Sequence, residues 1–453
     1  MDEDNSLTGR VIRYARVGGA VSNLAAKAAS GRLLGGSFSH SKQAADLQTA
    51  LGGLKGPLMK VAQILATVPD LLPPEYTREF IKLQCEAPSM GRSFVKRRMA
   101  AELGASWQLK FKEFKVDASK AASLGQVHKA RSHANDILAC KIQYPDMVSA
   151  VEADLAQLKF AFSIYQRYDK AIDPSEIHME LSERLREELD YTREARNIGL
   201  YRYMLGHERM IHIPRVIEEL STKRLLTMSW LDGEPLMDFA SSEQAVRNKV
   251  AKNMFRAWYL PFYNFGIIHG DPHLGNYTIR SDGSVNLLDF GCIRVFRPNF
   301  VTAVIDLFRA LRDNDMDLAI KAYETWGFTK LDREIIAILN QWAQFLYGPL
   351  LENKVRTIQE DKGTAYGTGI AAKVHTQLRE IGGIQPPREF VLMDRAAVGL
   401  GSVFTHLKAK INWHRMFHQL IDEFDEAKLA KEQLKILKKV GISIDSSPKP
   451  ENR

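Results

Sequence analysis

The sequence has few of the features that mark secreted, disulfide-bonded or membrane-spanning proteins. Its 453 residues include three cysteines, Cys85, Cys140 and Cys292, with no CxxC spacing, so neither a disulfide framework nor a structural zinc site is expected. The N-terminus is acidic where a signal peptide would be basic. No run reaches roughly 18 uninterrupted apolar residues, the length typical of a membrane-spanning helix. We therefore expect a reducing compartment, no secretion and no membrane span.

Acidic residues are missing from the start of the chain. Between Asn5 and Ala45 there is no aspartate or glutamate, whereas lysines and arginines recur. The segment 10–36 could lie as an amphipathic helix on an anionic membrane surface, and a frayed basic tail is the alternative. Between Asn5 and Ala45 only Tyr14 and Phe38 are aromatic, so nucleic-acid binding is not expected. We expect a cytoplasmic protein, with peripheral contact to the inner face of a membrane as an open alternative.

The pattern of apolar residues changes in type along the chain. It is helical from 56 to 86 and from 92 to 102, and near Phe111 it changes to short β-type runs between polar turns. A helical region is predicted at 148–203, and helices predominate after 231 apart from a loop and hairpin at 268–290. The predicted strands of a small antiparallel sheet cover 111–116, 125–131, 137–143, 215–218 and 224–229.

This order predicts an α+β fold in which a sheet-containing lobe precedes a helical lobe. The expected divisions are a basic arm (1–54), an N-terminal helical extension (55–110), an N-lobe with inserted helices (111–230), a C-lobe (231–345), a C-terminal helical extension (346–445) and a disordered tail (446–453).

The strongest chemical signal is the segment His-Gly-Asp-Pro-His-Leu-Gly-Asn at 269–276, followed thirteen residues later by Asp-Phe-Gly at 289–291. Phosphoryl transfer needs a positioned nucleophile and metal ions that neutralise phosphate charge. Asp271 could orient the attacking hydroxyl or water. Asn276 and Asp289 offer the oxygen ligands that Mg²⁺ prefers.

Either half of this pattern would be weak by itself, because aspartate and asparagine are common turn formers. Together they follow the order used by kinases, with a hydrophobic strand at 285–288 between them. The sequence therefore predicts ATP and Mg²⁺ as ligands of an atypical protein-kinase-like two-lobe fold.

Lys141 lies at the centre of the apolar run Ile137–Ile142, where an unpaired charge is costly. It is expected to pair with an acidic residue and with phosphates, although a lysine snorkelling from an edge strand is the simpler alternative. Glu188 and Glu187, on the predicted helix that follows, are both candidate partners. Upstream, the small-residue segment 121–126 stands where a protein kinase has its glycine-rich loop, and its backbone N–H groups could cradle phosphate.

These motifs resemble those of the UbiB family of atypical kinases, also called the AarF or coenzyme Q8 kinase-like family, from about Leu54 to Phe300. The resemblance matches the family's Glu-x-Asp to Glu188 and Asp190, which favours Glu188 as the partner of Lys141, and it makes Lys141, Asn276 and Asp289 the nucleotide and metal residues. The expected nucleotide-binding residues are Ala121, Ala122, Ser123, Gly125, Gln126, Lys141, Ser229 and Leu231.

The family's Lys-x-Gly-Gln motif is similar to Lys60-Val-Ala-Gln63, in which Ala62 replaces the glycine. The resemblance implies a regulatory lid formed by Lys60, Gln63 and Asp190. The simpler alternative is one polar face of an amphipathic helix.

Members of this family resemble ATPases more than protein kinases, which implies an ATP-dependent phosphoryl-transfer enzyme that supports ubiquinone or other isoprenoid-lipid metabolism at a membrane. The implied partners are a prenyl-lipid or quinone intermediate and a complex of biosynthetic enzymes. Two alternatives stay open: a small-molecule phosphotransferase of the aminoglycoside or choline kinase type, and a nucleotide-binding pseudokinase scaffold without turnover.

Overall fold

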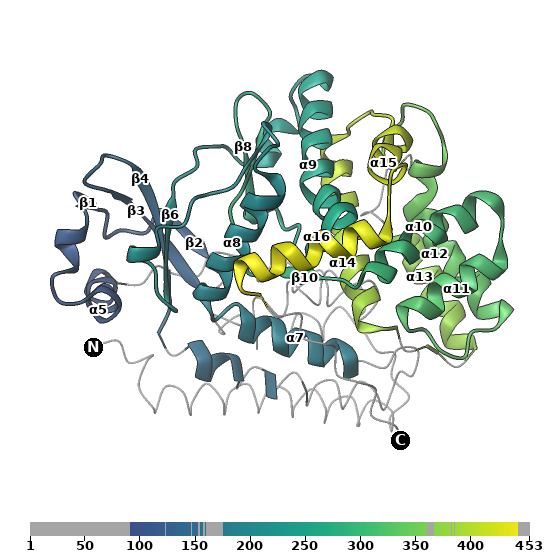
Figure 1. Cartoon of the computed structure of the whole chain (residues 1–453), viewed down its shortest axis with the longest axis horizontal. Helices are drawn as coiled ribbons and strands as arrows, with labels where there is room; N and C mark the ends of the chain where they lie inside the picture. The colour runs from purple at the N-terminus through teal and green to yellow at the C-terminus, as the bar shows by residue number, and fades with distance from the viewer. Residues whose placement is uncertain are drawn as a thin grey trace, which may run out of the picture.

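The computed structural model describes residues 91–122, 124–145, 147–152, 155, 156, 159, 175–359, 367–381, 383, 384 and 386–442. Within these residues, a smaller lobe that contains an antiparallel sheet lies beside a larger helical lobe (Figure 1). The predicted two-lobe α+β fold is thereby confirmed. The basic arm, the tail after 446, Lys60, Gln63 and Ser123 lie outside the described residues.

The smaller lobe is built on one five-stranded sheet in the order β1-β3-β4-β6, with β2 paired to β3. Its strands are β1 (Glu113–Phe114), β2 (Lys120–Ala122), β3 (Gly125–Arg131), β4 (Ile137–Gln143) and β6 (Leu225–Ser229), and its helices are α5 (Arg92–Leu103), α7 (Ser175–Glu187) and α8 (Tyr191–Leu205). The strands predicted at 125–131 and 137–143 are confirmed. The run predicted at 215–218 forms a single bridge, Val216 to Met228, because the chain turns into a short 3₁₀ helix at Glu218–Leu220.

The sheet is covered on one face by the helix α5. Val95 and Met99 of α5 pack with Leu138, Cys140 and Ile142, which alternate along β4. Side chains alternate between the two faces of a strand, so the residues between them point to the other face. Residues 91–110, which we assigned to a separate helical extension, therefore share a core with the N-lobe sheet.

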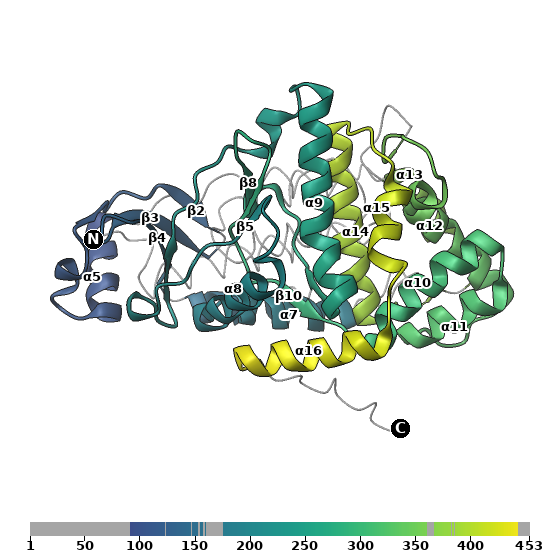
Figure 2. The same cartoon turned by 45° about the horizontal axis from the view of Figure 1, so that its top comes forward.

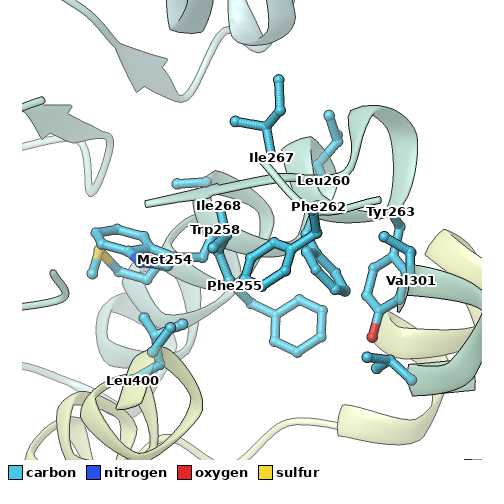
Figure 3. Packing of buried hydrophobic residues seen from close by; sticks show 14 of the residues in the cluster. Met254, Phe255, Trp258, Leu260, Phe262, Tyr263, Ile267, Ile268, Val301 and Leu400 are labelled. Carbon is cyan, nitrogen blue, oxygen red and sulfur yellow. The ribbon is translucent and has the colours of Figure 1, made fainter. Parts of the chain in front are cut away.

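The larger lobe is mostly helical, and its core surrounds the long helix α9. Its elements are β5 (Ile211–His212), α9 (Gln244–Phe265), β7 (Ile267–His269), β8 (Tyr277–Ile279), β9 (Val285–Leu287), β10 (Ile293–Val295), α10 (Pro298–Asp313), α11 (Met316–Trp326), α12 (Arg333–Leu351), α13 (Thr368–Glu380), α14 (Arg388–Leu407), α15 (Trp413–Ile421) and α16 (Glu426–Val440), with short 3₁₀ helices at Trp107–Lys110 in the smaller lobe and at Leu236–Phe239 and Leu274–Asn276 here. Met254, Phe255 and Trp258 of α9 pack with Ile268 and Leu400, as Figure 3 shows. This apolar packing fixes α9 against both β7 and α14.

Two small sheets hold the loops that carry the predicted motifs. β7 pairs with β10 in antiparallel register, His269 opposite Ile293, and β9 lies between β5 and β8. The segment 269–276 therefore leaves β7 directly beside the Asp-Phe-Gly segment, which precedes β10. The predicted hairpin between 268 and 290 is confirmed, and it is the local pairing of these strands that brings its two halves together.

Among the described helices, α14 alone is long and apolar enough, by length and composition, to cross a membrane. In this fold Leu392, Ala396 and Leu400 of α14 belong to the buried core. Arg395, the second of its two arginines, is also buried. The helix is thus part of the core of the larger lobe.

The last helix, α16, runs back across the molecule beside α8 and packs across the end of α9 (Figure 2). Gln433 of α16 is buried and donates two hydrogen bonds, to Phe265 O at 2.7 Å and to Phe296 O at 2.9 Å. At its C-terminal end, Lys439 stacks on Tyr203 of α8. This helix connects a helix of the smaller lobe to the larger lobe.

Candidate active site

Lys141 reaches the site because of its position in β4. Leu138, Cys140 and Ile142 face the α5 core, so Lys141 and Gln143 point to the face covered by α8. Gln143 donates to Leu189 O, 3.1 Å away, at the turn between α7 and α8. Lys141 is only 6% exposed, and a buried ammonium group requires charged or polar partners.

The ammonium group of Lys141 binds two carboxylates at once. Its Nζ lies 2.8 and 2.9 Å from the two oxygens of Glu194 and 2.8 Å from Asp289 Oδ2. Burial would lower the pKa of Lys141, but the charges of Asp289 and Glu194 outweigh this effect and hold the pKa well above its usual value. Lys141 is therefore a fixed cation that joins the sheet, α8 and the Asp-Phe-Gly segment.

The partner of Lys141 is Glu194, and the expectation that it would be Glu188 was wrong. α7 ends at Glu187, and Asp190 caps α8 by accepting hydrogen bonds from the backbone N–H groups of Thr192 and Arg193. Glu188 consequently lies in a turn, and the glutamate that faces the sheet lies in the next helix. The Cγ of Glu188 comes within 3.3 Å of the position a Cβ would take on Gly291, so Glu188 lies beside the Asp-Phe-Gly segment.

The other candidate, Glu187, has different partners. It forms ion pairs with Arg193, at 2.6 Å, and with Arg294, at 2.7 Å. Arg294 belongs to β10, so this contact ties the end of α7 to the strand that follows the Asp-Phe-Gly segment. Glu187 therefore stabilises the packing of α7, α8 and β10 next to the site.

Side chains of helix α8 also bind the backbone of the Asp-Phe-Gly segment. Glu194 Oε1 accepts a hydrogen bond from Phe290 N at 3.3 Å, and Asn197 Nδ2 donates to Phe290 O at 2.8 Å. Burial raises the pKa of Glu194 to about 7, and the charge of Lys141 opposes this rise. Neither Glu194 nor Asn197 was identified from the sequence, although both follow Asp190, whose residue type favours a helix start.

His269 couples the two halves of the motif. Its Nδ1 accepts a hydrogen bond from Asp271 N, 3.2 Å away, so the ring proton lies on Nε2, which donates to Asp289 O at 2.6 Å. Trp258 Nε1 donates to His269 O at 2.9 Å. The histidine thus sets the position of Asp271 relative to Asp289 through backbone contacts.

Asp271 has a charged partner that the sequence analysis missed. Arg395 Nη2 donates to Asp271 Oδ1 at 3.0 Å, and both side chains are buried. Arg395 comes from α14, 124 residues further along the chain. The one available signal was an arginine within a largely apolar helix, which a buried ion pair would explain.

Asn276 and Asp289 supply the oxygen atoms that a magnesium ion would need. Asn276 Nδ2 donates to Asp271 O at 3.0 Å, which orients the side-chain amide. Asp289 Oδ1 accepts from Gly291 N at 3.0 Å. Among the described residues there is no cluster of three or more His, Cys, Asp or Glu side chains that could hold a metal by itself. Mg²⁺ usually takes one or two protein ligands and completes its shell with phosphates and water, so this donor set fits Mg²⁺ bound with a nucleotide.

The small-residue segment forms a hairpin between β2 and β3. Ala121 pairs with Gln126 and Ala122 with Gly125. A Cβ on Gly125 would collide with Ile142 O and come within 3.0 Å of Tyr191 Oη. Glycine is therefore required where the hairpin lies against β4. Gln126 is buried, bonds to His128 and lies opposite Ile142, so its side chain points to the face covered by α5, away from Lys141.

Tyr191 joins this hairpin to Lys141. Its ring centroid lies 5.2 Å from Lys141 Nζ. Its buried hydroxyl has no hydrogen-bond partner among the described residues. Burial raises the pKa of Tyr191, so the phenol stays protonated. Sequence reasoning did not identify this residue.

Ser229 and Leu231 lie at the end of β6. Ser229 is opposite Leu138 of β4, and its Oγ accepts a hydrogen bond from Arg215 N at 2.9 Å. Both residues are half-buried. Their position at the exit from the sheet is compatible with the expected contact to a nucleotide, which stays a prediction.

Comparison with known proteins gives a consistent result. The family model described as the ABC1 atypical kinase-like domain matches residues 82–323. A chloroplast protein of Arabidopsis thaliana, ACTIVITY OF BC1 COMPLEX KINASE 7, is 29% identical over 62% of this chain and 42% of its own length. The mitochondrial atypical kinase COQ8B of Rattus norvegicus is 27% identical over 73% of this chain and 67% of its own length.

A solved structure shares the fold. A Mycobacterium tuberculosis protein, determined in complex with erythromycin, superimposes with a TM-score of 0.58 and 24% identity, over 84% of this chain and 96% of that one. At this level of identity the likeness concerns the fold.

Proposed function

Because this chain belongs to the ABC1 atypical kinase-like family, as the UbiB-type motifs indicated, we propose that it binds ATP with Mg²⁺ and catalyses phosphoryl transfer. The observation that carries the proposal is the contact of Lys141 with both Glu194 and Asp289. In protein kinases the lysine–glutamate pair and the aspartate of Asp-Phe-Gly must both be in place for catalysis. Here the ammonium group of Lys141 contacts both the glutamate, Glu194, and the aspartate, Asp289.

Each residue of the site has a role that its contacts support. Lys141 holds the phosphates of the nucleotide, and Asn276 with Asp289 binds the metal ion. When bound, Mg²⁺ neutralises phosphate charge. Asp271, held by Arg395, orients the attacking hydroxyl or water.

The connection after Asp-Phe-Gly argues for a small acceptor or water. Only Cys292 separates Gly291 from β10, and α10 begins three residues after β10 ends. Protein kinases place an activation segment here that carries their phosphorylation site. The short connection offers little surface for a peptide, which favours an ATPase or a kinase of small molecules.

The metal-binding role is tested with Asp289→Asn. We expect wild-type protein to bind ATP more tightly with Mg²⁺ than without it, and the variant to lose this difference, because an amide lacks the charge that holds the ion. Isothermal titration of the full chain, with and without Mg²⁺, measures both. Equal affinities in the two proteins under both conditions would refute the site assignment.

We further propose that this activity supports ubiquinone or another isoprenoid lipid, at a membrane surface and together with other enzymes of that pathway. The family resemblance and the relatives in mitochondria and chloroplasts support this proposal. Prenyl-lipid or quinone intermediates should accumulate in a strain that lacks the protein. Wild-type protein and Asp317→Asn, which alters an exposed residue of α11, should restore the lipid profile, whereas Asp289→Asn should not. A normal profile in the deletion strain would contradict the proposed pathway without affecting the nucleotide site.

A further inference from the structure

The larger lobe contains a cavity separate from the nucleotide site. It lies among helices α9, α10, α11, α12, α14 and α15, has a volume of about 100 Å³ and is partly open to solvent. Aromatic side chains dominate its lining, among them Tyr259, Tyr323, Trp326, Trp342, Tyr347 and Phe404.

One acidic side chain, Asp394, lines this otherwise apolar space. Its Oδ1 accepts a hydrogen bond from Trp342 Nε1 at 2.6 Å. Asp394 is half-buried, as expected of a side chain that lines a partly open cavity. Met393, Ala397 and Gly401 of the same helix line the cavity with it.

Among the residues that the structure describes, no cationic side chain contributes to the pKa of Asp394, which burial raises to about 7 against the opposing effect of the hydrogen bond from Trp342. The tyrosines that face the cavity are neutral near pH 7, because burial raises their pKa values. They are Tyr259, Tyr263, Tyr323 and Tyr347. A buried carboxylate without a cation is costly. A ligand that brings a positive charge would remove this cost.

Aromatic rings arranged around a carboxyl group are suited to one class of ligand. The faces of tryptophan and tyrosine rings attract ammonium groups, and such cages bind quaternary ammonium compounds. The rest of the lining, including Leu307, Leu339 and Leu350, is suited to an apolar chain. The two features together describe an amphiphile with a cationic head.

We propose that this cavity is a second binding site, which takes lipophilic ammonium compounds with the cation between Asp394 and the surrounding aromatic rings. The site does not depend on the proposed nucleotide function, since none of the residues around Lys141 lines it. Its occupancy is therefore measured as binding, without ATP.

The probe is decyltrimethylammonium, kept below its micelle concentration and titrated into the full chain by calorimetry. Decanol and decyl sulfate have the same chain length and serve as neutral and anionic probes. Wild-type protein should bind the ammonium compound roughly tenfold or more tightly than decanol, because a desolvated cation gains from both the carboxylate and the rings. Its affinity should fall as the pH drops below about 7, since binding must then displace a proton from Asp394.

Asp394→Asn keeps the side-chain volume and the acceptor for Trp342, so the fold should persist. This variant should lose the preference for the cation and its pH dependence, with decanol binding unchanged. Asp317→Asn removes the same charge from the surface of the lobe and should bind like wild type. The proposal is overturned if Asp394→Asn binds the ammonium compound as tightly as wild type, or if decyl sulfate binds equally well.

Discussion

At Lys141, three side chains from separate elements meet in one ion cluster. The cost of removing these charges from water is offset only because every group has a partner of opposite sign. Glu194 contributes both of its oxygens, and Asp289 contributes one. The cluster therefore aligns β4, α8 and the loop before β10, and a change at any one of the three residues should be felt as lost stability.

Glu194→Gln should lower the free energy of unfolding by about 2 kcal/mol, because a charged hydrogen-bond partner of a buried lysine is lost. Denaturant unfolding measures the change. Glu152→Gln is the control: Glu152 also makes two hydrogen bonds to one cation, Arg186, but both side chains are about half exposed, and such pairs contribute at most about 1 kcal/mol. Equal losses in the two variants would show that the cluster around Lys141 has no special weight.

Arg395 is expected to act as a positioning residue for Asp271. Arg395→Met removes the guanidinium group but keeps an apolar side chain of similar length. Turnover should then fall by about a hundredfold, the effect expected when a catalytic group is misplaced by about 1 Å, while the KM for ATP should change little. Arg395→Lys should recover part of the rate. If KM rises and kcat does not change, Arg395 contributes to nucleotide binding instead.

Helix α14 packs closely against the catalytic loop, residues 270–276, at a glycine. A Cβ on Gly399 would collide with Pro272 Cγ. Gly399→Ala should therefore destabilise the protein by about 1–3 kcal/mol, as overpacking does, despite the better helix propensity of alanine. In contrast, Gly199→Ala in α8, where a Cβ would meet nothing within 4 Å, should stabilise by roughly 0.5–1 kcal/mol. Thermal unfolding of both variants tests this difference in sign.

The elements that the sequence predicts well are those with strong local patterns. β3 and β4 were located because apolar residues fill short runs on either side of a polar turn, in which Asn135 adopts a left-handed φ of 69°. The break between α7 and α8 was missed because apolar residues continue at helical spacing through it. Only the capping preference of Asp190 marks the new helix. With that break missed, Glu187 and Glu188 were the candidates on one continuous helix, and the family resemblance then favoured Glu188 over the actual partner, Glu194.

The site divides in the same way between local and distant residues. Asp271, Asn276 and Asp289 lie within one short stretch of chain, so their motif could be read directly and the structure brings the stretch together. Arg395 joins them only because α14 packs on the catalytic loop. A contact of that kind depends on the whole arrangement of helices and leaves no pattern of spacing in the sequence.

On the scale of the whole molecule, α16 holds the two lobes in a fixed relation. It packs on α8, which carries Glu194, and on α9 and α10. Gln433→Ala would leave the buried carbonyl groups of Phe265 and Phe296 without this donor and should cost about 1–3 kcal/mol.

The expected local result of Gln433→Ala is faster hydrogen exchange in α8 and around Phe296, measured by mass spectrometry. Lys431→Ala changes an exposed residue of the same helix and should leave exchange unchanged. Identical exchange in α8 for wild type and Gln433→Ala would argue that α16 does not restrain the smaller lobe.

Helix α14 presents neighbouring residues to two compartments: Asp394 to the aromatic cavity and Arg395 to Asp271. If a ligand in the cavity displaces α14, the displacement would reach Asp271 through Arg395. Any change that this ligand makes in nucleotide affinity must then be matched, by the same factor, in the affinity of the ligand when the nucleotide binds first. Binding at one site would thereby be measurable at the other.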